Sequence, residues 1–146
     1  MTDRAGPSVI DASAIVPLVA REPCSAPARR WFRVAQDHLA SSVTIDLFDA
    51  ECTNAVWKRV RWSRWSIEDA ELALGRVLAL PFPRVAFGEI AGEALRLAWR
   101  FEITVYDACY AALAVSSGLP LITADRRLAR VARQAGCDVV CFTEGA

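Results

Sequence analysis

Short apolar segments alternate with longer amphipathic ones along the whole chain, and this alternation limits the possible folds more than any other feature. The apolar segments are too short to alternate between inward and outward side chains, which favours strands buried on both faces. Strands are predicted over residues 8–10, 84–87, 119–123 and 138–141, with a weaker one over 39–41. Helices are predicted over residues 13–20, 26–37, 46–61, 66–80, 88–100, 106–117 and 126–134.

Strands of this kind, separated by helices, are typical of a parallel sheet with helices on both faces. We therefore predict an α/β fold, a three-layer α/β/α sandwich with a short parallel sheet. The chain has 146 residues, close to the commonest size of one domain, and 54 % of them are hydrophobic. We expect residues 1–146 to form a single domain with a sizeable core.

The charged residues exclude several classes of protein. Seventeen basic residues balance seventeen acidic ones, so the chain is not a globally basic nucleic-acid partner. The only lysine is Lys58 and no Gly-Lys pair occurs, which excludes a P-loop. The only histidine is His38, so a Ser-His-Asp triad or a zinc site built on histidine would depend on that one residue.

The sequence also indicates where the protein acts. No apolar run reaches the ~18 residues of a spanning helix, and residues 1–7 contain no apolar leader. Five cysteines occur without a C-x-x-C pair, which favours reduced, buried thiols. We expect a cytoplasmic protein without a membrane partner.

Two predicted strands end directly in an aspartate. Asp11 follows the strand over residues 8–10, and Asp125 follows the strand over residues 119–123. The carboxyl ends of parallel strands share one edge of the sheet, and ligands of such sheets bind beyond that edge. Both aspartates are therefore expected there.

Two further acids lie within predicted helices. Glu51 shares a helix face with Asn54, and Asp107 opens an apolar helix on which Ala111 and Ala114 follow on the same side. Those small residues would let another element or a metal ion approach closely. A carboxylate in such surroundings is costly to bury unless it is paired, protonated or bound to a cation.

Each of these acids also has an alternative, purely structural interpretation. Asp11, Asp107 and Asp125 could each be a helix N-cap, and Glu51 a solvated helix residue. Their common placement toward one sheet edge favours the functional interpretation. The remaining acids considered are assigned to caps and solvated faces: Asp46, Asp49, Glu68, Glu89 and Glu93.

Taken together, four segments of the chain resemble PIN-domain ribonucleases, and among them the VapC toxins of bacterial toxin–antitoxin pairs. The resemblance covers nearly the whole chain, in the family's order and at similar spacing. No single segment is specific, but the four together are. They are Asp11-Ala12-Ser13, Glu51 with Asn54, Tyr106-Asp107-Ala108, and Leu121-Ile122-Thr123-Ala124-Asp125-Arg126-Arg127-Leu128.

This resemblance implies a PIN-like domain that acts as an endoribonuclease, the toxin of a type II toxin–antitoxin pair. It implies partners: an RNA substrate, an antitoxin of the VapB type, and a second copy of the chain in a homodimer or a toxin–antitoxin hetero-oligomer. It implies an acidic pocket of catalytic and metal-binding residues, Asp11, Glu51, Asp107 and Asp125, with Ser13, Asn54 and Thr123 in support. Because Asp49 lies close to Glu51 in the sequence, the assignment of Glu51 depends on the helix register.

Electrostatics favours a divalent cation independently of the family. Two carboxylates about 4 Å apart repel by roughly 4 kcal/mol at an effective dielectric near 20. Oxygen ligands suit Mg²⁺ or Mn²⁺, whereas zinc prefers histidine and cysteine. Such an ion can activate a water for attack on a phosphodiester, which gives 5′-phosphate and 3′-hydroxyl ends.

Basic and aromatic residues are candidates for contact with RNA or a partner. The expected phosphate contacts are Arg126, Arg130 and Arg133 on one helix and Lys58 and Arg61 on another, with solvated basic faces as the alternative. Three tryptophans near the latter helix, at positions 57, 62 and 65, predict an exposed apolar patch. Such a patch could stack on RNA bases, but docking of an antitoxin helix fits it better.

Two other functions compete with the nuclease. A haloacid-dehalogenase-like phosphatase also has an aspartate at its first strand end, but it needs D-x-D and a lysine. Here the third position is Ser13 and Lys58 is the only lysine. A non-catalytic PIN-like module that binds RNA or protein is the alternative from another class, and the presence of all four acids argues against it.

Overall fold

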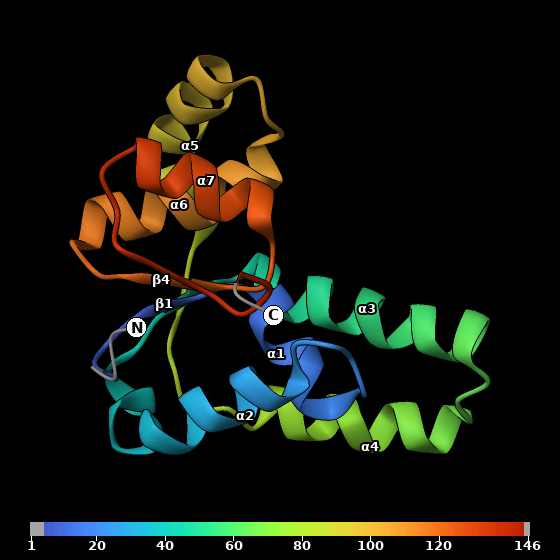
Figure 1. The fold of residues 1–146 in the computed structure, drawn as a ribbon. Coiled ribbons are helices and arrows are strands. Elements are labelled where there is room, and N and C mark those ends of the chain that lie inside the picture. The colour runs from blue at the N-terminus through green and yellow to red at the C-terminus, as the bar shows by residue number, and fades with distance from the viewer. Residues whose placement is uncertain (1–4, 145–146) are drawn as a thin grey trace.

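Among residues 5–144, five short parallel strands form the centre of the molecule; β1 and β4 are labelled in Figure 1. In this computed structural model, which describes residues 5–144, β1 (Val9–Ile10), β4 (Leu121–Thr123) and β5 (Val139–Cys141) pair in the order β1-β4-β5. A second parallel pair consists of β2 (Thr44–Ile45) and β3 (Arg84–Val85). A bridge between Val9 and Val43 joins the two sheets. Residues 1–4, part of the stretch expected to contain no leader, and residues 145–146 lie outside the described residues.

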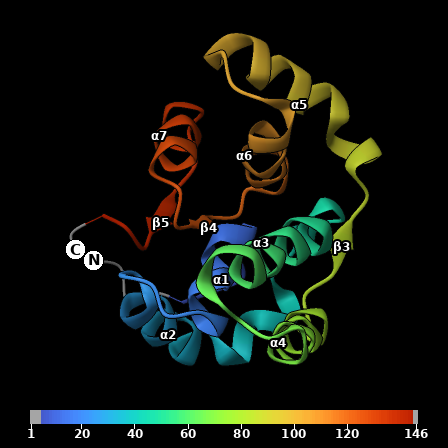
Figure 2. The same cartoon turned by 90° about the vertical axis from the view of Figure 1, so that its right-hand side faces the viewer.

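Helices cover both faces of the strands (Figures 1 and 2). One face carries α5 (Phe87–Phe101), α6 (Val105–Ser117) and α7 (Arg126–Gln134). The other carries α1 (Ala12–Val19), α2 (Ser25–Val34), α3 (Leu47–Ser63) and α4 (Ile67–Leu78). The predicted sandwich with a short parallel sheet is confirmed.

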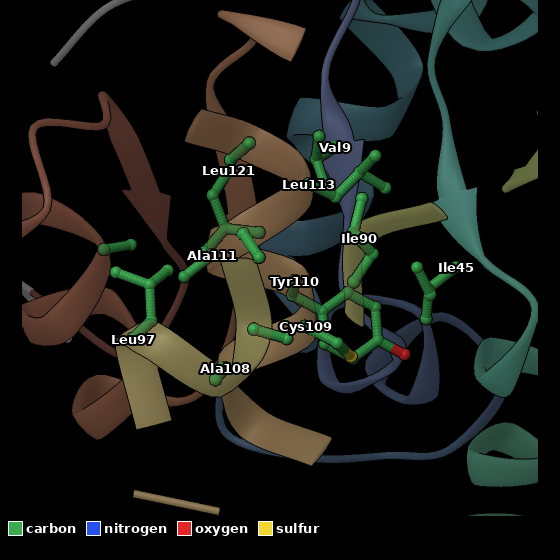
Figure 3. Close-up of a cluster of buried hydrophobic side chains, with 14 of the residues drawn as sticks. Val9, Ile45, Ile90, Leu97, Ala108, Cys109, Tyr110, Ala111, Leu113 and Leu121 are labelled. Carbon is green, nitrogen blue, oxygen red and sulfur yellow. The ribbon is translucent and has the colours of Figure 1, made fainter. Parts of the chain in front are cut away.

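Successive strand residues face opposite layers, which explains why the strands are apolar without alternation. Val9 and Leu121 pack into the hydrophobic cluster of α5, α6 and α7, shown in Figure 3. Ile10 and Ile122, the next residue of each strand, pack into the cluster of α1 to α4. Burying each such side chain contributes roughly 2 kcal/mol, so both layers stabilise the sheet.

The strand predicted over residues 39–41 is wrong. Those residues belong to a 3₁₀ helix, Gln36–Ser41, and the strand comes later, at β2. Short-range bonds hold the helix, since Ser42 Oγ donates to the carbonyl of His38 at 3.1 Å. β-Branched Thr44 and Ile45 are better strand formers than the Leu-Ala-Ser segment.

Two other boundaries differ from the prediction. The helix predicted over residues 26–37 ends at Val34, because the 3₁₀ helix follows it almost directly. The strand predicted over residues 84–87 is shorter, because Phe87 already begins α5. Its backbone N–H donates to Asp46 Oδ1 at 3.1 Å, so Asp46 supplies an acceptor at the start of that helix.

Helix α6 begins and ends at positions that its sequence specifies. The hydroxyl oxygen of Thr104 accepts a hydrogen bond from the Asp107 N–H at 3.1 Å and caps the helix. At the other end, Gly118 adopts a φ of 67°, a left-handed conformation that glycine tolerates best. Because Thr104 sets the start of α6, Asp107 lies in the first turn of the helix.

Within residues 5–144, no helix is both long and apolar enough to cross a membrane. All five cysteines fall in this range and all are free thiols. Four of them are buried, and Cys137 is partly exposed.

Candidate active site

Asp11 is a buried carboxylate at the carboxyl end of β1. Its side chain is only 4 % exposed, and it makes no capping bond to α1, although it directly precedes that helix. The hydroxyls of Ser13 and Thr123 both donate to its Oδ2, Thr123 at 2.7 Å. Burial raises the pKa of Asp11, the two hydroxyls oppose this shift, and the nearby charge of Asp125 adds to it.

The same two hydroxyls join the ends of β1 and β4. Ser13 Oγ accepts from the Ala124 N–H at 2.9 Å, and Thr123 Oγ1 accepts from the Asp125 N–H at 3.0 Å. The two hydroxyl oxygens lie 3.1 Å apart. Because β1 and β4 pair in parallel, the aspartates that follow them lie at one edge, as predicted.

Glu51 reaches the same region from α3. Its Oε1 accepts a hydrogen bond of 3.0 Å from the hydroxyl of Tyr110 on α6, while the neighbouring Cys52 is buried in the core. Burial raises the pKa of Glu51 to about 7; the Tyr110 bond opposes the shift, and the charges of Asp11 and Asp107 increase it. Glu51 therefore lies close enough to both aspartates to sense their charge.

Tyr110 was not among the candidate residues, yet it is the only hydrogen-bond partner of the Glu51 side chain within residues 5–144. Its ring is buried in the cluster of α5 to α7 (Figure 3). A buried tyrosine usually needs a partner for its hydroxyl. The hydroxyl of Tyr110, on a helix that otherwise consists mostly of small and apolar residues, is the sequence signal that could have identified this residue.

Asp107 lies on the first turn of α6 and is half-buried. It is not the N-cap, because Thr104 takes that role. Its carboxylate accepts no hydrogen bond from any described residue, which leaves both oxygens available to a ligand. The small residues after it, Ala111 and Ala114, are buried in the core cluster, where α5 packs against α6.

Asp125 caps α7. Its Oδ1 accepts from the N–H groups of Arg127 and Leu128 at 2.8 and 3.2 Å, so the structural interpretation of this residue is confirmed. Asp125 also borders a surface groove together with Glu51, so capping and a role at the site are compatible.

Two residues near Glu51 lie away from this cluster of acids. Asn54 is exposed, and its side chain makes no hydrogen bond to a described residue. Asp49 forms an ion pair of 2.9 Å with Arg84, instead of lying on a solvated face. The helix register therefore turns Glu51, and not Asp49, toward the aspartates.

A groove of about 560 Å³ opens beside the acids. It lies along α1 and α3, which pack against each other (Figure 2), and Thr143 near the C-terminus also lines it. Glu51 and Asp125 line it, together with Ser13 and Lys58. Arg59 and Glu22 form an ion pair at its wall.

The basic candidates lie in different surroundings. Lys58 lines the groove, whereas the Arg61 guanidinium lies 5.5 Å from the ring centroid of Trp62. Arg126 donates to the carbonyl of Thr143. On the same helix, α7, Arg130 is exposed, and Arg133 pairs with Glu144 at 2.6 Å.

The donor set fits a hard divalent cation in its chemistry. The polar side chains at this edge all offer oxygen, and burial together with mutual charge makes ionisation of Asp11 and Glu51 costly, a cost that a cation would reduce. Within residues 5–144, no three carboxylate, thiol or imidazole side chains converge tightly enough to form a finished ion site.

Comparisons with known proteins identify the family of this chain. The profile of the PIN domain matches residues 8–134, and the chain belongs to the PIN domain family. A relative named ribonuclease VapC3, from Pyrobaculum aerophilum, is 36 % identical over 83 % of this chain and 91 % of its own. Another from that organism, named exonuclease VapC9, is 35 % identical over 82 % of this chain and 81 % of its own.

A solved structure supports the fold. The crystal structure of PAE2754 from Pyrobaculum aerophilum is 32 % identical in sequence and superposes with a TM-score of 0.69. The match covers 93 % of this chain and 85 % of the other. The similarity to the PIN fold thus extends over nearly the whole length of both.

Proposed function

We propose that this protein is a Mg²⁺- or Mn²⁺-dependent endoribonuclease that acts, as one PIN-like domain, as the toxin of a type II toxin–antitoxin pair. One observation carries the proposal: Asp11 and Asp125 follow the parallel strands β1 and β4 at one edge of the sheet, where Glu51 on α3 lines a groove together with Asp125. Burial raises the pKa of Glu51, and the charges of Asp11 and Asp107 raise it further. Parallel sheets bind ligands at this edge. The relatives named ribonuclease support RNA as the substrate.

In this proposal Asp11 and Asp107 are the most direct ligands of the ion, and Glu51 and Asp125 complete the site. A bound divalent ion would supply a Lewis acid that lowers the pKa of a water and neutralises charge on the phosphodiester. Ser13 and Thr123 hold Asp11 through its Oδ2 and leave its Oδ1 available. The remaining candidate, Asn54, lies on the exposed side of α3, and its side chain makes no hydrogen bond to a described residue.

The proposed RNA path follows the groove. Lys58 lines it beside Glu51, and makes no ion pair with a described residue, so it is available to a phosphate. Arg126 and Arg130 offer further contacts on α7, and Arg61 near Trp62. The ion pair of Arg133 with Glu144 would have to open before Arg133 could contribute.

The proposed protein partners are a VapB-like antitoxin and a second copy of the chain. Helices α3 and α4 expose Trp57, Ile67 and Leu72, and α5 exposes Leu95 and Trp99. Exposed apolar side chains of this size are typical of partner surfaces. We propose the cytoplasm as the compartment, which suits five free thiols.

Cleavage of RNA by the purified protein tests the proposal. A pool of structured RNAs and a circular single-stranded RNA would be incubated with Mg²⁺, Mn²⁺ or EDTA. Asp11→Asn and Asp107→Asn would be compared with wild type and with Asp69→Asn, a control at an exposed acid on α4. Circular dichroism would check that each variant is folded.

We expect cleavage that needs the ion, survives in Asp69→Asn and is lost in both site variants. Cutting of the circle identifies an endonuclease, while cutting of linear RNA alone identifies an exonuclease. Products with 2′,3′-cyclic phosphate ends would contradict hydrolysis by an activated water. If nothing is cut and calorimetry shows no binding of Mn²⁺, the protein is a non-catalytic PIN-like module.

A further inference from the structure

One face of α3 continues from the acids along the groove. The residues of α3 that face the groove include Glu51, Ala55, Lys58 and Trp62, spaced by three or four positions. That spacing puts them on one side of the helix. With a rise of 1.5 Å per residue, Trp62 lies about 16 Å along the axis from Glu51. The face thus presents a carboxylate, a small residue, a cation and an aromatic ring in that order.

Trp62 differs from the other exposed tryptophans. It is 67 % exposed and lines the groove, whereas Trp57, on the same helix and 50 % exposed, does not line it. The Arg61 guanidinium lies 5.5 Å from the centroid of the Trp62 ring and can hold the ring by a cation–π contact. Trp62 therefore offers an exposed aromatic ring in the same groove as Glu51, and this ring is not needed to fill the core.

The chemistry of the groove favours a nucleic acid over a protein helix. A docked amphipathic helix needs a row of apolar anchor sites. Among the described residues, Val16 and Trp62 are the only large apolar side chains that line this groove, and they come from different helices. Lys58, between the acids and Trp62, offers a cation to a phosphate. A cation for the backbone with a separate stacking ring is a usual arrangement for single-stranded RNA. The acids that line the groove near Lys58, Glu51 and Asp125, would be neutralised by the proposed ion.

We propose that Trp62 is a binding site for one nucleobase of single-stranded RNA, a few nucleotides from the bond that is cleaved. The base stacks on the indole ring, and Lys58 contacts a phosphate between the base and the carboxylates. This inference rests on the proposed nuclease function and adds a substrate-binding position to it.

Binding of short RNAs to uncleaving protein tests the inference. The probes are fluorescein-labelled 12-mers of oligo(U) and oligo(A), measured by fluorescence anisotropy with Mg²⁺. All proteins contain Asp11→Asn, which prevents turnover. Trp62→Ala, Trp62→Phe and the control Trp57→Ala would be compared, each checked for folding by circular dichroism.

We expect Trp62→Ala to weaken binding by about tenfold, because loss of one stacked base typically costs this much or more. Trp62→Phe should retain most of the affinity, and Trp57→Ala should change it less than twofold. Equal effects of Trp62→Ala and Trp57→Ala, or no effect of either, would overturn the stacking site and leave this surface to a protein partner.

Cleavage assays separate this inference from the proposed function. If wild type cuts RNA but Trp62→Ala binds and cuts as Trp57→Ala does, the stacking site fails and the nuclease stands. If Trp62→Ala alone loses RNA affinity but wild type never cuts, the nuclease fails and the RNA-binding position stands. If neither probe binds to the folded protein, the inference is wrong.

Discussion

Asp11 and Asp125 occupy equivalent positions but have different partners. Each follows a parallel strand, precedes a helix and lies at the same edge of the sheet. Asp125 caps its helix through Oδ1, whereas Asp11 makes no capping bond and is held by the hydroxyls of Ser13 and Thr123. The position at a strand end therefore brings a carboxylate to the edge, and the hydrogen-bond partners of that carboxylate then differ between Asp11 and Asp125.

The largest difference between the two aspartates should appear in catalysis. We expect Asp11→Asn to lower the rate of RNA cleavage by about a hundredfold or more, because the ion loses a buried ligand. Asp125→Asn should lower it by only about tenfold, since an asparagine still caps α7. Single-turnover cleavage with Mn²⁺ measures both. Equal losses would contradict the distinction between them.

Glu51 should give the next largest effect, a dependence of the free energy of unfolding on pH. Its pKa is about 7 in the folded protein against 4.5 ordinarily, so the folded state binds the proton more tightly. The free energy of unfolding of the ion-free protein should then fall as the pH rises from 4.5 to 7. We expect Glu51 to contribute about 2 kcal/mol to this fall, a value reduced for its partial exposure.

Glu51→Gln isolates that contribution, because glutamine does not titrate and can still accept from Tyr110. Urea unfolding of wild type and variant at pH 5 and pH 8, both in EDTA, measures it. The variant should lose less stability than wild type between the two pH values. Parallel losses in the two proteins would show that Glu51 is ionised at ordinary pH without cost.

Thr123 is the group through which the two aspartates connect. Its hydroxyl donates to Asp11 Oδ2 and accepts from the Asp125 N–H. Thr123→Val should weaken Mn²⁺ binding by about tenfold, the usual effect of losing a partner of a metal ligand. Thr123→Ser keeps the hydroxyl and should restore most of the affinity in calorimetry. Failure of serine to restore it would mean that packing, and not the hydroxyl, matters.

The smallest effect is expected from the cap itself. Asp125→Ala removes the acceptor for Arg127 and Leu128 and should lower the free energy of unfolding by about 1 kcal/mol. Asp125→Asn should lower it by a few tenths at most. Urea unfolding in EDTA compares the two variants. Identical stabilities would show that capping by Asp125 does not stabilise α7.

The sequence predicted the layers and the edge of the sheet because those follow from local patterns. Apolar strands ending in Asp11 and Asp125 require only that the strands run parallel, which they do. The capping role of Asp125 could not be separated from a ligand role, since both use the same residue type. The strand expected over residues 39–41 failed because local hydrogen bonds favoured a 3₁₀ helix over a weak apolar pattern.

Contacts between segments that are distant in the sequence could not be predicted from the sequence pattern. Tyr110 and Glu51 are 59 positions apart, and the hydrogen bond between them forms only in the folded chain. Likewise, Asp49 and Glu51 are two residues apart on α3, and only the ion pair with Arg84 shows which of them faces away from the site. Sequence reasoning identified the acids, while packing assigned their partners.

The most direct test of the ion site is the stability of wild type and Asp11→Asn at pH 8, with and without Mn²⁺. Without the ion, Asp11→Asn should be the more stable protein, because it lacks a buried carboxylate that is costly to ionise. At about 100 times its Kd, Mn²⁺ should add about 2.7 kcal/mol to wild type and much less to the variant, which reverses the order. Equal stabilisation of both proteins, or of neither, would contradict a cation site at Asp11.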